Sequence, residues 1–137
     1  MADTVRKRVL VVDDDRGVCR LLASQIAALG FDVKTALSAK EAHAAVEHQP
    51  ADLALVDMRL AGDSGFDILK KWRENGRVRT TLMVTAYANA GLVEDCRKLG
   101  IDGFIEKPFD LEHVRLLMLR LLGEAAPGTA EEKEEVP

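Results

Sequence analysis

Acidic side chains directly follow two short apolar segments of the chain, and they are the residues best suited to chemistry. Three aspartates at positions 13–15 follow residues 8–12, and Asp57 follows residues 53–56. Clustered carboxylates raise one another's pKa, so such a cluster is tolerated mainly when a cation lies among them. Mg²⁺ suits these ligands because it binds one or two carboxylates and leaves positions for water and phosphate oxygens. If the two segments are neighbours, the pattern predicts a magnesium-dependent transfer site with Asp57 as the nucleophile.

A hydroxyl group and an ammonium group follow two later apolar segments in the same way. Thr85 ends residues 81–85, and Lys107 and Pro108 follow residues 103–106. Both groups can contact phosphate oxygens, and a lysine neutralises charge on a transferring phosphoryl group. A cis peptide bond before Pro108 is a further hypothesis, because it would aim the lysine inward.

Taken singly, each of these signals is weak. An acidic run at a helix start is most often a cap, and a lone aspartate at a strand end is most often a turn residue. The order of the signals along the chain is more specific. The ends of the five segments carry, in turn, an acidic cluster, no chemically active residue, an acid, a hydroxyl and a lysine.

The elements that must position these groups are five apolar segments that alternate with segments of helical period. This alternation predicts a parallel sheet with helices on both faces, whose ligands bind beyond the carboxyl ends of the strands. The predicted strands are residues 8–12, 31–35, 53–56, 81–85 and 103–106.

Capping residues and apolar spacing indicate the helices between these strands. The expected caps are Ser38 with Glu41, Ser64 or Gly65, and Asp110 at helix starts, and Gly30 and Gly100 at helix ends. The expected buried stripes are Val18, Leu21, Leu22, Ile26 and Leu29 in the first helix and Leu111, Val114, Leu117, Met118 and Leu121 in the fifth. Leu116 and Leu119 are expected on the exposed side of the fifth helix.

The charge of the chain is concentrated at its end. The net charge is −4, but residues 123–137 carry five Glu and one Lys, which leaves 18 basic and 18 acidic side chains in residues 1–122. The only basic run is Arg6, Lys7 and Arg8, which does not indicate a nucleic-acid binder. We expect one folded domain over residues 1–122 and a disordered acidic tail, or the start of a linker, over residues 123–137.

The chain shows no sign of membrane insertion or of a disulfide framework. Its apolar runs are about four residues long, far below the roughly 20 needed to span a bilayer. The apolar stretch after the basic N-terminus stops at the three aspartates, so it does not predict a secretory signal. Cys19 and Cys96 lack metal or redox spacing and are expected as free thiols in a cytoplasmic protein.

Four segments together resemble the response-regulator receiver family. RVLVVDDD, LALVDMRLAGDSG, TLMVTAY and DGFIEKPF look like the four signature segments of that family, in order and at its spacing, over residues 8 to 122. The resemblance implies a flavodoxin-like, doubly wound α/β fold, with five parallel strands in the order 2-1-3-4-5 and five flanking helices. It also implies a cytoplasmic two-component signalling domain that catalyses only its own phosphorylation and dephosphorylation.

The resemblance also implies the roles of individual residues. Asp57 would accept a phosphoryl group from a phosphohistidine on a sensor histidine kinase or phosphotransfer protein. Asp14, Asp57 and the backbone carbonyl of Arg59 would bind Mg²⁺, and Asp13 would contribute mainly through water. Thr85 and Lys107 would contact the phosphoryl group. Thr85 and the aromatic residue Phe104 would then switch a face that binds an unidentified output partner or a second copy of the chain.

This sequence departs from the family at two positions, and two further positions bear on the lifetime of the acyl phosphate. Ala61 stands where the family usually has proline, and Phe104 stands where it often has tyrosine, so an output that needs a tyrosine hydroxyl is in doubt. Arg59 and Tyr87 lie two residues after Asp57 and Thr85, at places that border the path of the hydrolytic water in the family. We expect these two large side chains to lengthen the lifetime of the acyl phosphate.

Two other functions compete with this interpretation. A phosphohydrolase with an aspartyl-phosphate intermediate would need two aspartates two residues apart, as Asp13 and Asp15 are, but the chain has no segment for a cap domain. A receiver-shaped binding module that is never phosphorylated is the second alternative. Binding of beryllofluoride with Mg²⁺, and turnover of external phosphate esters, would separate the three. The three histidines, His43, His48 and His113, are expected in surface or packing roles.

Overall fold

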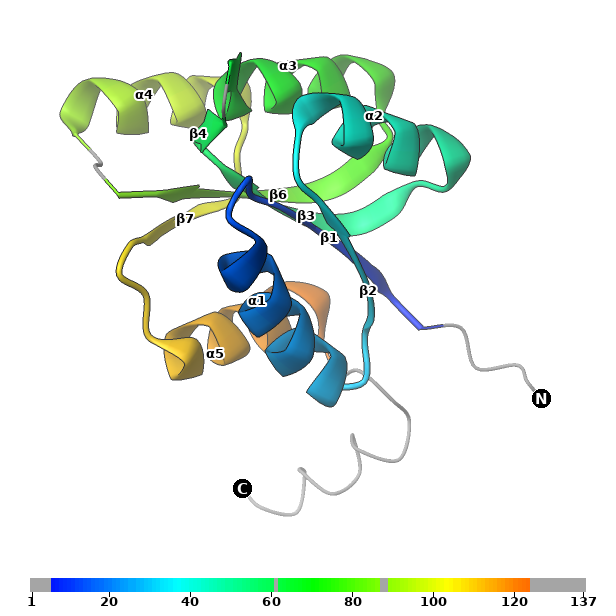
Figure 1. The fold of residues 1–137 in the computed structure, drawn as a ribbon. Coiled ribbons are helices and arrows are strands. Elements are labelled where there is room, and N and C mark those ends of the chain that lie inside the picture. Colours follow the sequence, from blue (N-terminus) through cyan, green and yellow to red (C-terminus); the bar gives the residue numbers. More distant parts are fainter. Residues whose placement is uncertain (1–5, 61, 87–88, 124–137) are drawn as a thin grey trace.

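The computed structural model describes residues 6–60, 62–86 and 89–123, and these form an α/β fold around one parallel sheet (Figure 1). The five strands of this sheet are β1 (Arg8–Val12), β2 (Asp32–Ala36), β3 (Ala51–Asp57), β6 (Val78–Thr85) and β7 (Gly103–Glu106). They lie in the order β2-β1-β3-β6-β7 and every neighbouring pair is parallel. The predicted fold class and strand order are therefore confirmed.

The five helices cover both faces of this sheet. They are α1 (Arg16–Ala28), α2 (Ala39–His48), α3 (Gly65–Asn75), α4 (Ala90–Leu99) and α5 (Leu111–Leu122). Figure 1 shows α1 and α5 on one face and α2, α3 and α4 on the other. Alternate residues of the strands contribute to the two core layers on opposite faces of the sheet. In β1, Val9 and Val11 pack under α1 and α5, whereas Leu10 and Val12 pack under the other three helices. Burial on both faces explains why the strands are almost continuously apolar.

The strand predictions differ from the structure mainly in length. The first and fifth strands have the predicted bounds, but β3 and β6 begin earlier than predicted because Ala51 pairs with Val78 and Leu53 pairs with Thr80. The second strand begins one residue later than predicted, at Asp32. A short antiparallel pair, β4 (Arg59–Leu60) and β5 (Asp63–Ser64), was not predicted.

The predicted caps are present. Ser38 Oγ accepts a hydrogen bond from the Glu41 N–H (3.1 Å), while Glu41 reaches back to the N–H of Leu37 (2.8 Å) rather than to that of Ser38. Ser64 and Asp110 are the N-caps of α3 and α5. The two glycines predicted at helix ends, Gly30 and Gly100, have positive φ values of 97° and 91°, the left-handed conformation that favours glycine.

Two leucines lie differently from the predictions. Leu21 of α1 is 44% exposed, so its predicted burial is wrong, whereas Cys19, which was not part of the predicted stripe, is buried. Leu116 of α5 is exposed as predicted, but Leu119 packs against the core, so the prediction for Leu119 is wrong. An ideal 100° step placed Leu119 on the outer side, whereas the layer shared with α1 covers a wider part of α5. Among the described residues, no helix has the length and apolar character to cross a membrane.

Candidate functional site

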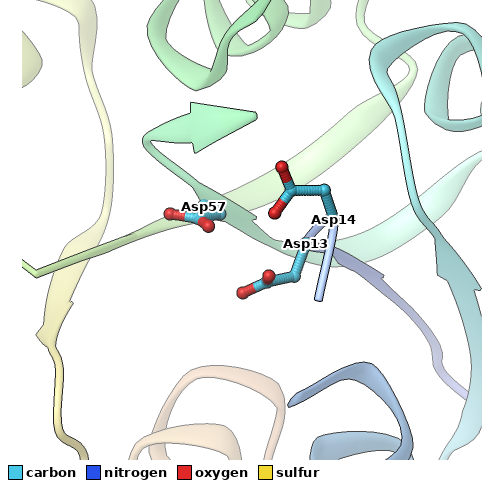
Figure 2. A group of neighbouring side chains, drawn as sticks. All are labelled: Asp13, Asp14 and Asp57. Atoms are coloured by element: carbon cyan, nitrogen blue, oxygen red, sulfur yellow. The ribbon is translucent and has the colours of Figure 1, made fainter. Parts of the chain in front are cut away.

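The ends of β1 and β3 bring the acidic side chains together. Val12 pairs with Val56 across these two strands, so Asp13 and Asp57 follow paired positions and emerge side by side. One carboxylate oxygen from each of Asp13, Asp14 and Asp57 lies within 4.8 Å of the others (Figure 2). Asp13 and Asp57 are 2% and 8% exposed, whereas Asp14 is exposed to solvent. The predicted convergence of carboxylates is therefore present.

The fourth acidic residue of the cluster faces elsewhere. Oδ1 of Asp15 accepts hydrogen bonds from the N–H groups of Gly17 and Val18 at 2.8 and 3.2 Å, which makes Asp15 the N-cap of α1. Of the two aspartates that a phosphohydrolase would need, Asp13 belongs to the acidic group with Asp57, whereas Asp15 caps the helix. The arrangement therefore gives little support to a phosphohydrolase.

Lys107 supplies positive charge to the two buried acids. Its Nζ lies 3.0 Å from Oδ2 of Asp13 and 3.3 Å from Oδ2 of Asp57, and it donates a hydrogen bond to each. The peptide bond between Lys107 and Pro108 is cis, as hypothesised. The lysine comes from the end of β7, so three strand ends contribute to one site.

Electrostatics at the site favour the binding of a cation. Burial, followed by the nearby charge of Asp13, raises the pKa of Asp57, although the N–H of Arg59 and the ammonium of Lys107 act in the opposite direction. For Lys107, burial lowers the pKa, but the hydrogen bond to Asp13 and the charge of Asp57 outweigh it, so the pKa is raised. Two buried carboxylates thus share one ammonium group, and the carboxylate of Asp14 lies close to both. A hard divalent cation with oxygen ligands fits that donor set.

Thr85 and the backbone around Asp57 form the wall of a cleft. Thr85 is 3% exposed, and its carbonyl accepts a hydrogen bond from the Lys107 N–H at 2.8 Å. The Arg59 N–H donates to Oδ1 of Asp57 at 3.3 Å. A cleft of about 410 Å³ is lined by Asp57, Arg59, Thr85, Asn89, Leu92 and Lys107, among others. The predicted acceptor Asp57, Thr85 and Lys107 therefore line one shared cleft.

Gly65, which the sequence indicated only as a possible helix start, lies against the site. Its N–H donates to the carbonyl of Met58 at 2.9 Å. A Cβ atom at this position would lie 2.2 Å from the backbone oxygen of Asp57, so only glycine fits. A glycine beside a cap residue gives no sign of such a close approach, which depends on where α3 crosses the end of β3.

Phe104 and two of the histidines lie away from the acidic cluster. Phe104 is half-buried and lines a second cleft of about 390 Å³, together with Thr85, Val93 and His113. His43 packs edge-on against Trp72, with ring centroids 5.9 Å apart, which confirms a packing role.

Both cysteines lie in the described part of the chain, whereas three other features discussed from the sequence do not. Cys19 and Cys96 are buried free thiols, and burial together with the charge of Asp13 raises the pKa of Cys19 to about 11. Ala61, Tyr87 and the tail after Gly123 lie outside the described residues.

Comparison with known proteins gives a family model and relatives that agree with one another. A family model described as "Response regulator receiver domain" matches residues 9–118. The response regulator protein PilR of Pseudomonas aeruginosa is 32% identical over 132 residues, which are 96% of this chain and 29% of PilR. Sporulation initiation phosphotransferase F of Bacillus subtilis is 31% identical over 114 residues, which are 81% of this chain and 90% of that protein.

Some relatives are much longer than this chain, and solved structures share its fold. The chain spans only 29% of PilR and 61% of the acid tolerance regulatory protein ActR of Rhizobium meliloti, so it matches a part of each. A CheY-like receiver domain from Methanospirillum hungatei has a TM-score of 0.79 at 27% identity, covering 88% of this chain and 97% of that one. The non-phosphorylated HemR receiver domain from Leptospira biflexa has a TM-score of 0.81 at 28% identity, covering 89% and 98%.

Proposed function

Because the chain belongs to the response regulator receiver domain family, we propose that it is a phosphoryl-accepting switch of a two-component system, with Asp57 as the acceptor. The observation that carries this proposal is the position of Lys107, whose ammonium lies 3.0 Å from Asp13 and 3.3 Å from Asp57. This role is supported by a buried carboxylate at the end of a parallel strand that is hydrogen-bonded to an ammonium group, in a cleft that Thr85 also lines.

The proposed reaction is transfer from a phosphohistidine on a sensor histidine kinase or a phosphotransfer protein. A carboxylate oxygen of Asp57 attacks phosphorus, a P–O bond forms, the P–N bond breaks, and the imidazole leaves. Lys107 neutralises charge on the transferring group, and the Thr85 hydroxyl holds one of its oxygens. Asp14, Asp57 and the Arg59 carbonyl would hold Mg²⁺, with Asp13 acting through water, and the ion would neutralise negative charge on the phosphoryl group. The relative named a phosphotransferase supports this class of reaction.

The proposal extends to the output of the switch. Residues 1–122 would form the receiver domain and residues 123–137 a tail or the start of a linker, in a cytoplasmic protein. Movement of Thr85 toward the phosphoryl group would let Phe104 change position, because both line the same second cleft. The changed face would bind an output partner or a second copy of the chain, rather than nucleic acid or a membrane.

Labelling of the acceptor tests this function directly. Asp57→Asn should abolish labelling by acetyl phosphate with Mg²⁺, and Asp14→Ala should remove most of the metal binding. Asp95→Asn is a matched control, because Asp95 is exposed on α4 and is not part of the acidic group. Full labelling of Asp57→Asn would disprove the acceptor assignment. Turnover of external phosphate esters by the parent protein would instead support a hydrolase.

A further inference from the structure

Asn89 occupies two environments at once. It is the N-cap of α4, and its Oδ1 accepts a hydrogen bond from the Leu92 N–H at 2.9 Å. The same residue lines the cleft that contains Asp57, Thr85 and Lys107. An asparagine side chain has two hydrogen-bond donors on Nδ2 in addition to its acceptor oxygen.

The donor half of this side chain is unused within the described part of the protein. Nδ2 of Asn89 donates no hydrogen bond to any described residue, although its oxygen is fixed by the cap. Lys107, in contrast, already donates to both Asp13 and Asp57. The cleft therefore contains a neutral donor that has not been assigned any role.

A phosphoryl group on Asp57 would add negative charge to this cleft. Three oxygens carrying about two negative charges would enter a space whose acidic residues already share one ammonium group. Each oxygen can accept more than one hydrogen bond, and hydrogen bonds to charged oxygens are stronger than those to neutral oxygens. A fixed amide on the α4 side of the cleft would approach from a direction different from that of Lys107, which comes from β7.

We propose that Asn89 is a further phosphoryl-binding residue, whose amide N–H donates to an oxygen of the group on Asp57 while its Oδ1 continues to cap α4. This inference rests on the proposed function of Asp57. It makes one side chain part of both the phosphoryl site and the first turn of α4. Occupancy of the site is thereby linked to the start of a helix that also contributes Val93 to the second cleft.

Binding of beryllofluoride with Mg²⁺ to the full chain tests the proposal. Asn89→Ser and Asn89→Asp both keep an oxygen that caps the helix, since Asn, Asp and Ser are similarly good N-caps. We expect affinity for the mimic to fall about fivefold in Asn89→Ser, because the serine hydroxyl is attached closer to the backbone than the amide nitrogen and reaches less far into the cleft. Affinity should fall more than tenfold in Asn89→Asp, because a carboxylate replaces the donor. Unchanged thermal unfolding without the mimic would show that the cap is retained.

Ala90→Asp is the charge control, because Ala90 is exposed in the same turn of α4 and does not line the cleft. Its affinity for the mimic should stay within about twofold of the parent value. The proposal is overturned if Asn89→Ser binds the mimic like the parent, or if Ala90→Asp weakens binding as much as Asn89→Asp. Failure of the parent protein itself to bind the mimic would overturn the proposed function instead.

Discussion

The ammonium nitrogen of Lys107 lies 3.3 Å from Oδ2 of Asp57, so the proposed acceptor is hydrogen-bonded to a cation before any phosphoryl group arrives. The same nitrogen is 3.0 Å from Asp13, and both carboxylates are buried. One positive charge therefore offsets two buried negative charges, with Asp14 close by. The balance between these charges determines both the stability of the resting protein and its readiness to bind a cation.

The first prediction is that Lys107→Met and Asp57→Asn change stability in opposite directions when metal is absent. Removing Lys107 leaves two buried carboxylates without their cation, which should lower the free energy of unfolding by about 2 kcal/mol at pH 7. Asp57→Asn should raise it by about 1 kcal/mol, because burial and Asp13 disfavour the charged form of Asp57. Urea unfolding in EDTA measures both values.

The sign follows from the raised pKa of Asp57. An acid whose pKa is higher in the folded state binds more protons there, so its destabilising effect is present at neutral pH and is relieved as the pH falls. Mg²⁺ should raise the melting temperature of the parent and of Lys107→Met, and have little effect on Asp57→Asn. A stabilising effect of Mg²⁺ on Asp57→Asn equal to that on the parent would contradict this account.

The second prediction concerns Gly65. A Cβ atom would lie 2.2 Å from the Asp57 carbonyl oxygen, which forces the end of β3 and the start of α3 apart. Gly65→Ala should therefore lower the free energy of unfolding by about 2–4 kcal/mol and slow labelling by acetyl phosphate. Gly91→Ala is the control, because Gly91 lies in the first turn of α4, where alanine is favourable. Parental stability in Gly65→Ala would show that the backbone moves there at little cost.

The sequence predicted the parts of the site that depend on strand ends. Asp13, Asp57, Thr85 and Lys107 each follow an apolar segment, and parallel strands bring their carboxyl ends to one edge of a sheet. A strand can be recognised from the residue types of one short segment, and the rule then places the carboxyl ends of the strands together. The positions of Ser38 and Asp110 as caps were predictable for the same reason.

The features that the sequence did not predict depend on contacts between distant segments. The need for Gly65 arises because the start of α3 lies against the end of β3, and the burial of Leu119 arises from the width of the layer between α5 and α1. No role was predicted for Asn89, and only the structure shows that it lines the same cleft as Asp57. Periodicity gives the inner side of a helix but not how far its neighbours extend around it.

The third prediction concerns His43, which packs against Trp72, the only tryptophan in the sequence. Burial, followed by the charge of Lys71, lowers the pKa of His43, while Asp63 and Glu47 oppose the shift. The folded protein therefore binds this proton less well than the unfolded chain. Stability should fall as the pH drops through 6.5, by well under 1 kcal/mol, and His43→Gln should remove that part of the pH dependence.

Trp72 provides the measurement for this third prediction. Its fluorescence in the folded state should titrate with a midpoint below 6.5, and the titration should be absent in His43→Gln. His48→Gln is the control, because His48 is exposed at the end of α2. A midpoint above 6.5 would mean that the two nearby acids outweigh burial and Lys71.

The fourth prediction is a long-lived acyl phosphate. Arg59 is exposed and lines the cleft beside Asp57, and Tyr87 lies two residues after Thr85 in the sequence. Large side chains at these two positions are expected to obstruct in-line attack by water. The phosphorylated parent should therefore decay more slowly than Arg59→Ala/Tyr87→Ala, by about threefold to tenfold, equivalent to roughly 1 kcal/mol of barrier. Arg79→Ala, an exposed arginine of β6, is the control, and equal decay of all three proteins would refute the prediction.

The last prediction concerns Leu116, which is 52% exposed on α5. Because Leu119 packs on the core, only Leu116 of the original pair is available for contact with another molecule. If the face formed by α4, β7 and α5 changes when Phe104 moves, Leu116 and Val93 become part of one recognition surface. Burying one leucine contributes roughly 1.5–3 kcal/mol, which suits a weak and switchable contact rather than a permanent dimer.

We expect beryllofluoride with Mg²⁺ to promote self-association or partner binding, and Leu116→Ser to remove this gain without preventing phosphorylation. Leu21→Ser is a matched control, because Leu21 is 44% exposed on α1, which packs with α5 on the same face of the sheet but is remote in sequence from Phe104. Sedimentation velocity with and without the mimic measures the effect, since a ligand shifts an equilibrium only by its different affinity for the two states. If Leu116→Ser associates like the parent, Leu116 is an ordinary exposed residue, and the output face lies elsewhere on the molecule.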